Sequence, residues 1–333
     1  MAGDITVLSH YLAPLRRWLE PGDITELVIN RPGELAVEGP GGWTFREDKA
    51  LTESWLTTLA KAAAAFTAQD VTPETPICST VLPTGERCQI VLPPAAERMS
   101  LTVRKPSAVQ LDLDALAAQG LFDQVAIARG DLTDVEHALL ALRDARDWPG
   151  FFRLAVESRR NILISGSTGS GKTTFAKALV QLIPAHERLL TIEDARELVV
   201  PHRNAVHLLY AKDGQGLAKI GPKHLLESAL RMRPDRILLQ ELRDGTAFYF
   251  LRNVNTGHPG SITTIHADSA TLAFEQLTLL VKESEGGRDL ARDDIRSLLH
   301  LLVDVVVQMR RVEGRFRMTE VWYEPLRKRQ LAS

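Results

Sequence analysis

The chain of 333 residues contains only two cysteines, Cys78 and Cys88, and neither belongs to a C-x-x-C pair. This scarcity argues against a cysteine-rich zinc site or a disulfide framework and favours a reducing compartment. No run of 18 apolar residues exists, because polar side chains interrupt the richest stretch, 298–309, so no transmembrane helix is expected. The N-terminus also lacks the basic start and long apolar stretch of a signal peptide. We therefore expect a cytoplasmic protein whose membrane attachment, if it has one, is peripheral.

The chain also lacks a strong excess of charge of either sign. Its net charge is -2 at pH 7, which argues against a protein that coats nucleic acid with a basic surface. Basic residues are concentrated only near the C-terminus, where a solvated surface is the simpler interpretation and contact with anionic lipid or nucleic acid is the alternative. They are Arg310, Arg311, Arg315, Arg317 and the run 327–329.

A complete phosphate-binding motif is present in the middle of the chain. Residues 166–173 read GSTGSGKT and match G-x-x-x-x-G-K-[ST] (here the P-loop), between a strand-like apolar run at 161–165 and a helical pattern at 174–180. A strand, a glycine-rich turn and a helix start direct backbone N–H groups and the helix dipole at a phosphate. The motif therefore predicts nucleotide binding by Gly166, Ser167, Thr168, Gly169, Ser170, Gly171, Lys172, Thr173 and Thr174. Lys172 is expected to reach the β- and γ-phosphates, and the Thr173 hydroxyl to bind Mg²⁺.

The patterns on either side of the P-loop predict two domains. Alternation and turn residues predict hairpins at 24–38 and 78–93, a helix at 51–67 capped by Thr52, and a strand at 100–104. From residue 151 onward apolar runs alternate with helical stretches, which favours an α/β domain with a mostly parallel sheet and a final antiparallel hairpin. We predict a smaller mixed α+β N-terminal domain at 1–135, a linker at 136–150 and the P-loop domain at 151–333.

Three predicted strands end in polar side chains that suit hydrolysis. Because ligands bind beyond the carboxyl ends of parallel strands, Glu193, Glu241 and His266 are expected near the P-loop. Glu241 suits positioning of the attacking water or a metal-linked role, and Glu193 is its expected partner through metal-bound water. His266 suits a γ-phosphate contact, the alternative being a histidine satisfied by a carbonyl. Asp194 is expected to cap a helix at 195–198, with catalysis as the alternative.

Taken together, these segments resemble the secretion-ATPase superfamily, and closely its type IV secretion and conjugation branch. The glycine that many members have before the second acid is Gln240 here, and the four-cysteine insertion of some type II relatives is absent, which both favour the type IV branch. The resemblance covers about residues 20–325. Its residues are the P-loop, Thr191 to Asp194, Leu230 to Leu239 with Glu241, Thr256 to Ser261 with His266 and Ala267, and the N-terminal segments 24–33, 85–87 and 103–107.

The resemblance implies a RecA-like P-loop domain behind a PAS-like N-terminal domain, assembled as a homohexamer at the cytoplasmic face of the inner membrane. It implies ATP and Mg²⁺ as cofactors, with Thr173, Glu193 and Glu241 at the metal and Lys172, Glu193, Glu241 and His266 in catalysis. Arg87 and Arg104 would reach the phosphates from the N-terminal domain, between which and the P-loop domain the nucleotide would lie. The implied partners are inner-membrane components, other ATPases of the channel, and a transported protein or DNA.

Other functions remain open from the sequence. Within the enzyme class, the alternative is a type II secretion or pilus assembly or retraction motor. In another class, the alternative is a nucleotide-gated docking ring with little turnover. A helicase fits the P-loop but not the charge, and no basic stretch interleaved with aromatic residues suggests a bound nucleic-acid strand.

Overall fold

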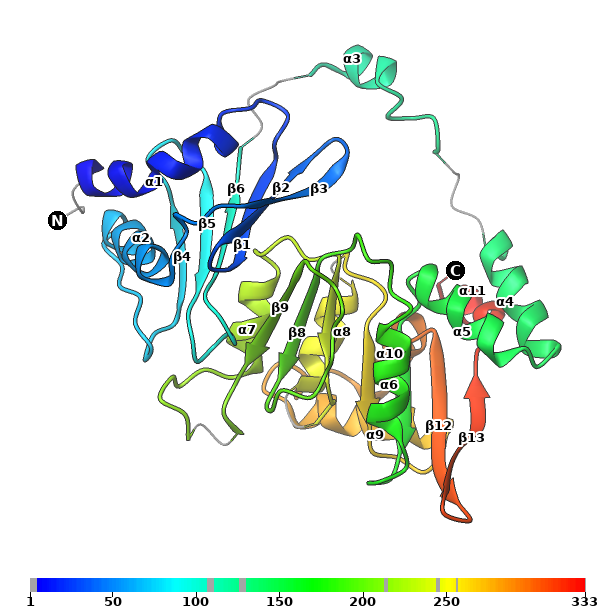
Figure 1. The fold of residues 1–333 in the computed structure, drawn as a ribbon. Coiled ribbons are helices and arrows are strands. Elements are labelled where there is room, and N and C mark those ends of the chain that lie inside the picture. Colours follow the sequence, from blue (N-terminus) through cyan, green and yellow to red (C-terminus); the bar gives the residue numbers. More distant parts are fainter. Residues whose placement is uncertain are drawn as a thin grey trace.

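The computed structural model describes residues 5–106, 111–125, 130–212, 215–243, 246–255 and 257–332. Within these ranges, the N-terminal part is an antiparallel sheet with two helices on one face (Figure 1), its strands in the order β3-β2-β1-β6-β5-β4. The two predicted hairpins and the strand at 100–104 are confirmed. The elements are α1 (Ile5–Leu19), β1 (Glu26–Arg31), β2 (Glu34–Gly39), β3 (Gly42–Glu47), α2 (Glu53–Phe66), β4 (Ile77–Val81), β5 (Arg87–Val91) and β6 (Ser100–Arg104).

The amphipathic pattern of each element explains this arrangement. Thr52 caps α2 as predicted, its hydroxyl accepting a hydrogen bond from the Trp55 N–H at 3.2 Å. Leu27 and Ile29 of β1 point to the same face and pack in one buried cluster with α1 and α2. The opposite face of this sheet is left for contacts with the rest of the chain.

The P-loop domain contains the predicted mostly parallel sheet, covered by helices on both faces. Strands β10-β8-β9 and β11-β7-β12 run parallel, β13 is antiparallel to β12, and the two groups meet where Glu241 bridges to Thr264. The strand order is therefore β9-β8-β10-β11-β7-β12-β13. The elements are α4 (Asp134–Asp144), α5 (Trp148–Glu157), β7 (Ile162–Gly166), α6 (Lys172–Val180), β8 (Leu189–Glu193), β9 (Ala205–Leu209), α7 (Pro222–Ala229), β10 (Arg236–Leu239), α8 (Thr246–Asn255), β11 (Ile262–Ile265), α9 (Ala270–Glu283), α10 (Arg292–Leu302), β12 (Val305–Val312), β13 (Arg315–Trp322) and α11 (Pro325–Ala332).

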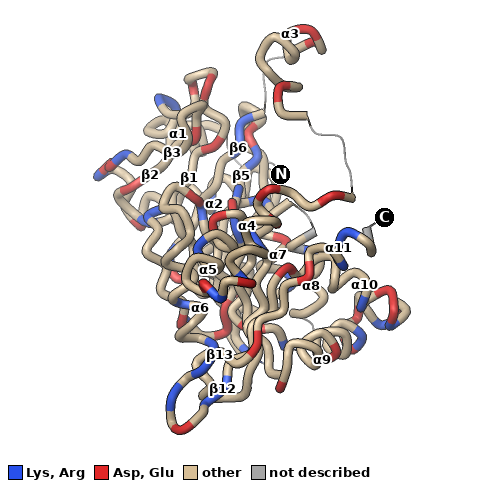
Figure 2. Tube along the Cα trace, turned by 90° about the vertical axis from the view of Figure 1, so that its right-hand side faces the viewer, with Lys and Arg blue, Asp and Glu red and all other residues tan. Residues whose placement is uncertain are grey.

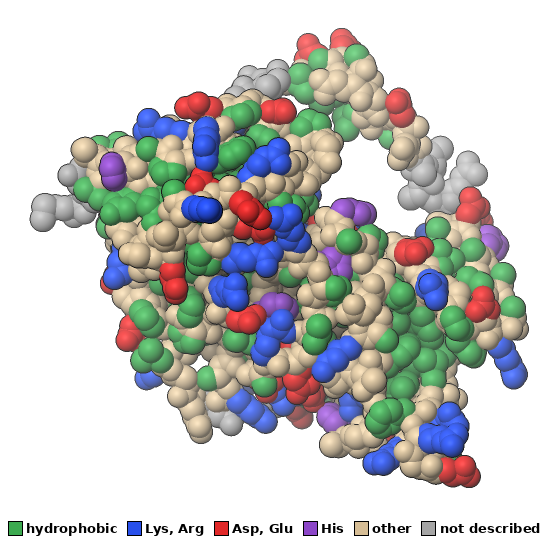
Figure 3. Space-filling model, in the orientation of Figure 1, with side chains coloured by type: hydrophobic (Ala, Val, Ile, Leu, Met, Phe, Trp, Pro, Cys, Tyr) green, Lys and Arg blue, Asp and Glu red, His purple; other side chains and the backbone are tan. Residues whose placement is uncertain are grey.

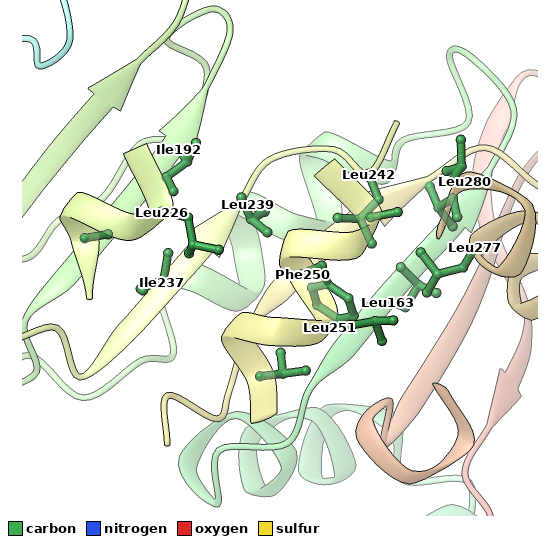
Figure 4. Close-up of a cluster of buried hydrophobic side chains, with 14 of the residues drawn as sticks. Leu163, Ile192, Leu226, Ile237, Leu239, Leu242, Phe250, Leu251, Leu277 and Leu280 are labelled. Carbon is green, nitrogen blue, oxygen red and sulfur yellow. The ribbon is translucent and has the colours of Figure 1, made fainter. Parts of the chain in front are cut away.

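Strand β7 shows why its sequence is apolar throughout. Leu163 points to one side, into the cluster with Phe250 and Leu277 from α8 and α9 (Figure 4). Ile162 and Ile164 point to the other side, into the cluster that includes helices α5 and α6. Because both faces are covered, consecutive residues are all buried, as is typical of parallel strands. The predicted mixed α/β fold is confirmed.

Residues 136–150, predicted as the linker, instead form packed structure. They lie in α4 and the start of α5, and Leu139 is fully buried in the cluster beneath α6. Thr133 and Glu136 form a capping box at the start of α4, and Glu136 also binds Arg329 of α11 at 2.9 Å. Helix α3 (Leu113–Ala118) comes earlier in the chain and buries none of its side chains. It arches away from both domains (Figure 1).

The N-terminal domain lies against the β9 edge of the P-loop domain. Backbone hydrogen bonds join Ala95 to Leu209 and Glu97 to His207, both at 2.9 Å, and the Gln89 amide donates to the Ser228 hydroxyl at 2.8 Å. On the face shown in Figure 3, Lys and Arg side chains gather along this boundary. In the strand order β7 is four strand spacings from β9, about 19 Å. The backbone contacts between the domains are therefore several strands away from the strand that carries the P-loop.

Candidate active site

The P-loop has the strand–loop–helix geometry that its sequence predicts. Strand β7 ends at Gly166, and α6 begins at Lys172 directly after Gly171, whose φ is +92°. A Cβ on Gly166 would lie 2.5 Å from both the Met309 carbonyl oxygen and the Ser170 Oγ, so a larger residue would clash with the neighbouring strand. The Ser170 hydroxyl is buried without a hydrogen-bond partner. This leaves a polar group inside the loop for a ligand such as a phosphate.

Lys172 is folded back into the loop. Its side chain is largely buried, and Nζ donates to the carbonyl oxygens of Gly166 at 2.7 Å and Ser167 at 3.0 Å. Burial lowers the pKa of the Lys172 ammonium, and the nearby charge of Glu241 opposes that shift. The negative charge that acts on this buried ammonium is that of Glu241, which does not contact it directly. A bound phosphate would place a negative charge in direct contact with it.

His266 connects Lys172 to Glu241. Its Nδ1 lies 3.4 Å from the Lys172 Nζ, and its Nε2 lies 3.2 Å from the Glu241 Oε1. An ammonium only donates and a carboxylate only accepts, so the neutral tautomer with hydrogen on Nε2 satisfies both neighbours. The three side chains lie beyond the carboxyl ends of three strands: Lys172 follows β7 at the start of α6, Glu241 follows β10 and His266 follows β11. The structure thus brings together three residues that the sequence singled out separately.

Glu193 is placed differently from Glu241. It lies at the end of β8 and shares a small pocket with Glu241, but its carboxylate accepts hydrogen bonds from the Thr191 hydroxyl and from the N–H groups of Glu197 and Leu198, all at 2.8 Å. Burial raises the pKa of Glu193, but the hydrogen bonds from His207, these N–H groups and Thr191 outweigh burial and hold it below its ordinary value. The carboxylate is therefore ionised and largely engaged within its own segment.

Asp194 does not cap a helix, so that prediction is wrong. Residues 195–198 form no helix, because the N–H groups that a cap would satisfy are bound by Glu193 instead. Asp194 forms an ion pair with Arg243, and both line the pocket that contains Glu193 and Glu241. Sequence reasoning also missed Phe316 of β13, whose ring lies against Gly171 of the P-loop. Only the register of the β12–β13 hairpin could have indicated it.

Comparison with known proteins places this geometry in a family. The Type II/IV secretion system protein family matches residues 24–313. The chain belongs to this family. It is 51% identical to the type IV secretion system protein VirB11 of Bartonella quintana, covering 98% of this chain and 96% of the relative. It is 46% identical to the VirB11 protein of Brucella suis, covering 98% and 92%.

A solved structure gives the same result. The VirB11 ATPase of the Brucella suis type IV secretion system, crystallised in complex with sulphate, superposes with a TM-score of 0.90 at 45% identity. The match covers 97% of this chain and 99% of that one. The resemblance predicted from the motifs is thereby confirmed, and the chain is an ATPase of this secretion family.

The residues of this secretion ATPase fit a magnesium ion that is shared with the nucleotide. Among the residues that the structure describes, no group of three His, Cys, Asp or Glu could hold a metal by itself. Mg²⁺ takes few protein ligands and completes its shell with water and phosphate oxygens. The hydroxyl of Thr173, the second residue of α6, and the carboxylate of Glu241 suit that arrangement.

Arg87 and Arg104 lie at the other end of the sheet from the P-loop. They are opposite each other on β5 and β6 and line a cavity of about 840 Å³ between the domains. Its other basic residues, Arg159, Arg231 and Arg233, precede β7 and β10, so this cavity is at the amino ends of the strands. The P-loop is at the carboxyl ends. The structure therefore does not bring the two arginines to the nucleotide site of the same chain.

Glu26 in this cavity gives the stability of the secretion ATPase a pH dependence. The side chain is only 4% exposed, and burial raises the pKa of its carboxyl to about 7, although Arg104 at 3.5 Å opposes the shift. The folded state holds a proton on Glu26 that the unfolded state releases above about pH 4.5. The contribution of Glu26 to the free energy of unfolding is therefore fully present below that pH and is lost as pH rises through 7.

We therefore expect the stability of Glu26→Gln relative to the parental protein to be about 2–3 kcal/mol greater at pH 8 than at pH 5. Urea unfolding at the two pH values measures this, with Glu34→Gln, at the exposed ion pair with Arg203, as the control. An equal stability difference at both pH values would contradict the assignment.

Proposed function

We propose that this chain is the ATP-hydrolysing motor of a type IV secretion or conjugation system, powering substrate export or pilus assembly. The observation that carries the proposal is the contact series from Lys172 through His266 to Glu241 at the mouth of a complete P-loop. It gives one group for the phosphates and one for the attacking water, with a histidine between them. The high identity to VirB11 proteins over nearly the whole chain favours the type IV branch.

The proposed roles follow from what each side chain can donate or accept. The P-loop N–H groups and the Lys172 ammonium hold the β- and γ-phosphates and stabilise the charge that develops on the transferred phosphoryl group. Glu241 accepts a hydrogen bond from the attacking water and orients it, while His266 holds Glu241 and senses the γ-phosphate. A magnesium ion at Thr173, with Glu241 and water linked to Glu193, would neutralise phosphate charge. Glu193 supports this edge of the site and orders residues 197–198.

The proposed assembly is a homohexameric ring, in which Arg87 and Arg104 act on the nucleotide of an adjacent subunit. Two observations support this: both arginines lie in a basic interdomain cavity at the amino ends of the strands, and the P-loop of the same chain is at the carboxyl ends. Guanidinium groups bind phosphate oxygens strongly, so their contact would couple phosphate loss to domain position.

The proposed location is the cytoplasmic face of the inner membrane, in contact with membrane components and other ATPases of the channel that pass a protein or DNA substrate. Among the described residues, no helix is both long and apolar enough to cross a membrane. Attachment would therefore go through the surface of the ring and its partners.

Mixing of two inactive variants tests the ring and the shared site together. Lys172→Ala and Arg87→Ala are each expected to hydrolyse ATP poorly, and mixed subunits should recover part of the activity, because some interfaces then combine an intact P-loop with an intact Arg87. Two variants of the P-loop, Lys172→Ala and Thr173→Ala, serve as the control pair and should not recover.

Light scattering with ATP and Mg²⁺ gives the oligomeric state. A stable monomer, or a mixture no more active than its components, would contradict the proposal, and slow turnover insensitive to membranes or partners would favour a docking ring.

A further inference from the structure

The β12–β13 hairpin projects past the P-loop and has no role in the site described so far. β12 is parallel to β7 with Met309 opposite Gly166, the last residue of β7, so residues 310–317 extend beyond the end of that strand. Figure 1 shows the hairpin reaching beyond the sheet beside α6, and Figure 2 shows its basic residues at the projecting end. The hairpin is therefore at the edge where a nucleotide held by the P-loop would lie.

The two faces of this hairpin differ. Side chains directly opposite each other on antiparallel strands share a face, so Arg311 and Phe316 are neighbours. Phe316 points at the P-loop: a Cβ on Gly171 would lie 2.8 Å from the Phe316 Cγ. Arg310 is on the other face and donates to the Asp268 carbonyl at 2.6 Å. Arg311 and Phe316 thus face the nucleotide site, and the opposite face supports the segment after His266.

The strand order indicates which part of the nucleotide would lie next to Phe316. Glu241 and His266 follow β10 and β11, which lie on one side of β7, and the hairpin lies on the other side. The γ-phosphate must be next to Glu241 and His266 for hydrolysis. The rest of the nucleotide would then extend to the other side of the P-loop, toward β12 and β13, where the flat π face of its base would meet the hairpin.

Phe316 has the free surface that such a contact needs. Its side chain is 50% exposed although it lies against Gly171, so part of the ring remains open. The Arg311 Nε donates to the carbonyl oxygen of Gly314 in its own turn at 3.3 Å. An aromatic ring stacks on a base, and a guanidinium packs well against the same π surface.

We propose that Phe316 and Arg311 form the platform for the nucleotide base, with the base stacked on the Phe316 ring and the Arg311 guanidinium beside it. This inference rests on the proposed function, since it takes the P-loop as the phosphate site. It assigns the hairpin to binding rather than to the chemical step.

The test compares ADP with inorganic pyrophosphate, which carries the same phosphates without a base. By calorimetry with Mg²⁺, Phe316→Ala should bind ADP about 10-fold more weakly than the parental protein and pyrophosphate equally well. Phe316→Leu, which keeps apolar bulk against Gly171 but has no flat ring, should show most of the same loss. Val312→Ala, 43% exposed on the opposite face of the hairpin, is the matched control and should change neither.

Three outcomes would overturn the platform: equal weakening of both ligands, full ADP affinity in Phe316→Leu, or no change in Phe316→Ala. The first two would mean that Phe316 only supports the P-loop. Failure of the proposed function looks different, because Lys172→Ala would then bind ADP and pyrophosphate as tightly as the parental protein does.

Discussion

Lys172→Ala should lower the rate of ATP hydrolysis by about 10³-fold at saturating ATP. Lys172 is the cation inside the P-loop, and the transferred phosphoryl group gains most of its stabilisation from charge and positioning rather than from covalent chemistry. The variant should still fold, because the ammonium contacts only the carbonyl oxygens of Gly166 and Ser167 and the His266 ring, and its burial does not favour the charged form. Phosphate release under Mg²⁺ and ATP measures the rate, and thermal unfolding checks the fold.

Lys177→Ala is the matched control for this variant. It removes the same charge from the last turn of the same helix, α6, and should leave the rate close to the parental one. If Lys172→Ala hydrolysed ATP at the parental rate, the P-loop would not be the catalytic site. A loss in both variants would show that the positive charge of α6 matters as a whole, and that the loop position does not.

The position of the site could be predicted because the P-loop motif fixes its own surroundings. A buried strand must precede it and a helix must follow it, and parallel strands present their carboxyl ends on the same edge. Glu241 and His266 follow short apolar runs, which are the signal of such strands. The contact of His266 with both Lys172 and Glu241 could not be predicted, since it depends on side-chain direction across segments 94 residues apart.

The relation between the domains could not be predicted for a different reason. Four apolar runs of similar length all fit a buried parallel strand, and nothing in them fixes the order in which they pair. In the observed packing, Arg87 and Arg104 line a cavity at the amino ends of the strands, whereas the P-loop lies at their carboxyl ends. Residues 136–150 were predicted as the linker because α4 is mostly polar on its exposed side. The capping box at Thr133 and the buried Leu139 that follows it are what mark this stretch as a packed helix.

Glu241→Gln should bind ATP normally and hydrolyse it about 10²- to 10³-fold more slowly. Glutamine has the same shape, and its amide oxygen still accepts a hydrogen bond from the His266 Nε2–H, so the contact series to Lys172 is kept. It carries no negative charge, however, and cannot take a proton from water. The expected result is a trapped, unhydrolysed complex, which single-turnover measurements with radiolabelled ATP would detect as bound ATP without product.

Glu193→Gln decides whether the assignment belongs to Glu241 alone. The Glu193 carboxylate accepts hydrogen bonds from Thr191 on one oxygen and from the N–H groups of Glu197 and Leu198 on the other, and a glutamine can keep the two N–H bonds while its amide nitrogen donates to the Thr191 hydroxyl. This variant should therefore lose about 1 kcal/mol of stability, because neutral hydrogen bonds replace charge-assisted ones, with a smaller loss of rate than Glu241→Gln. If Glu241→Gln released product at the parental rate while Glu193→Gln trapped ATP, the base would be Glu193, and Glu241 would only hold the histidine.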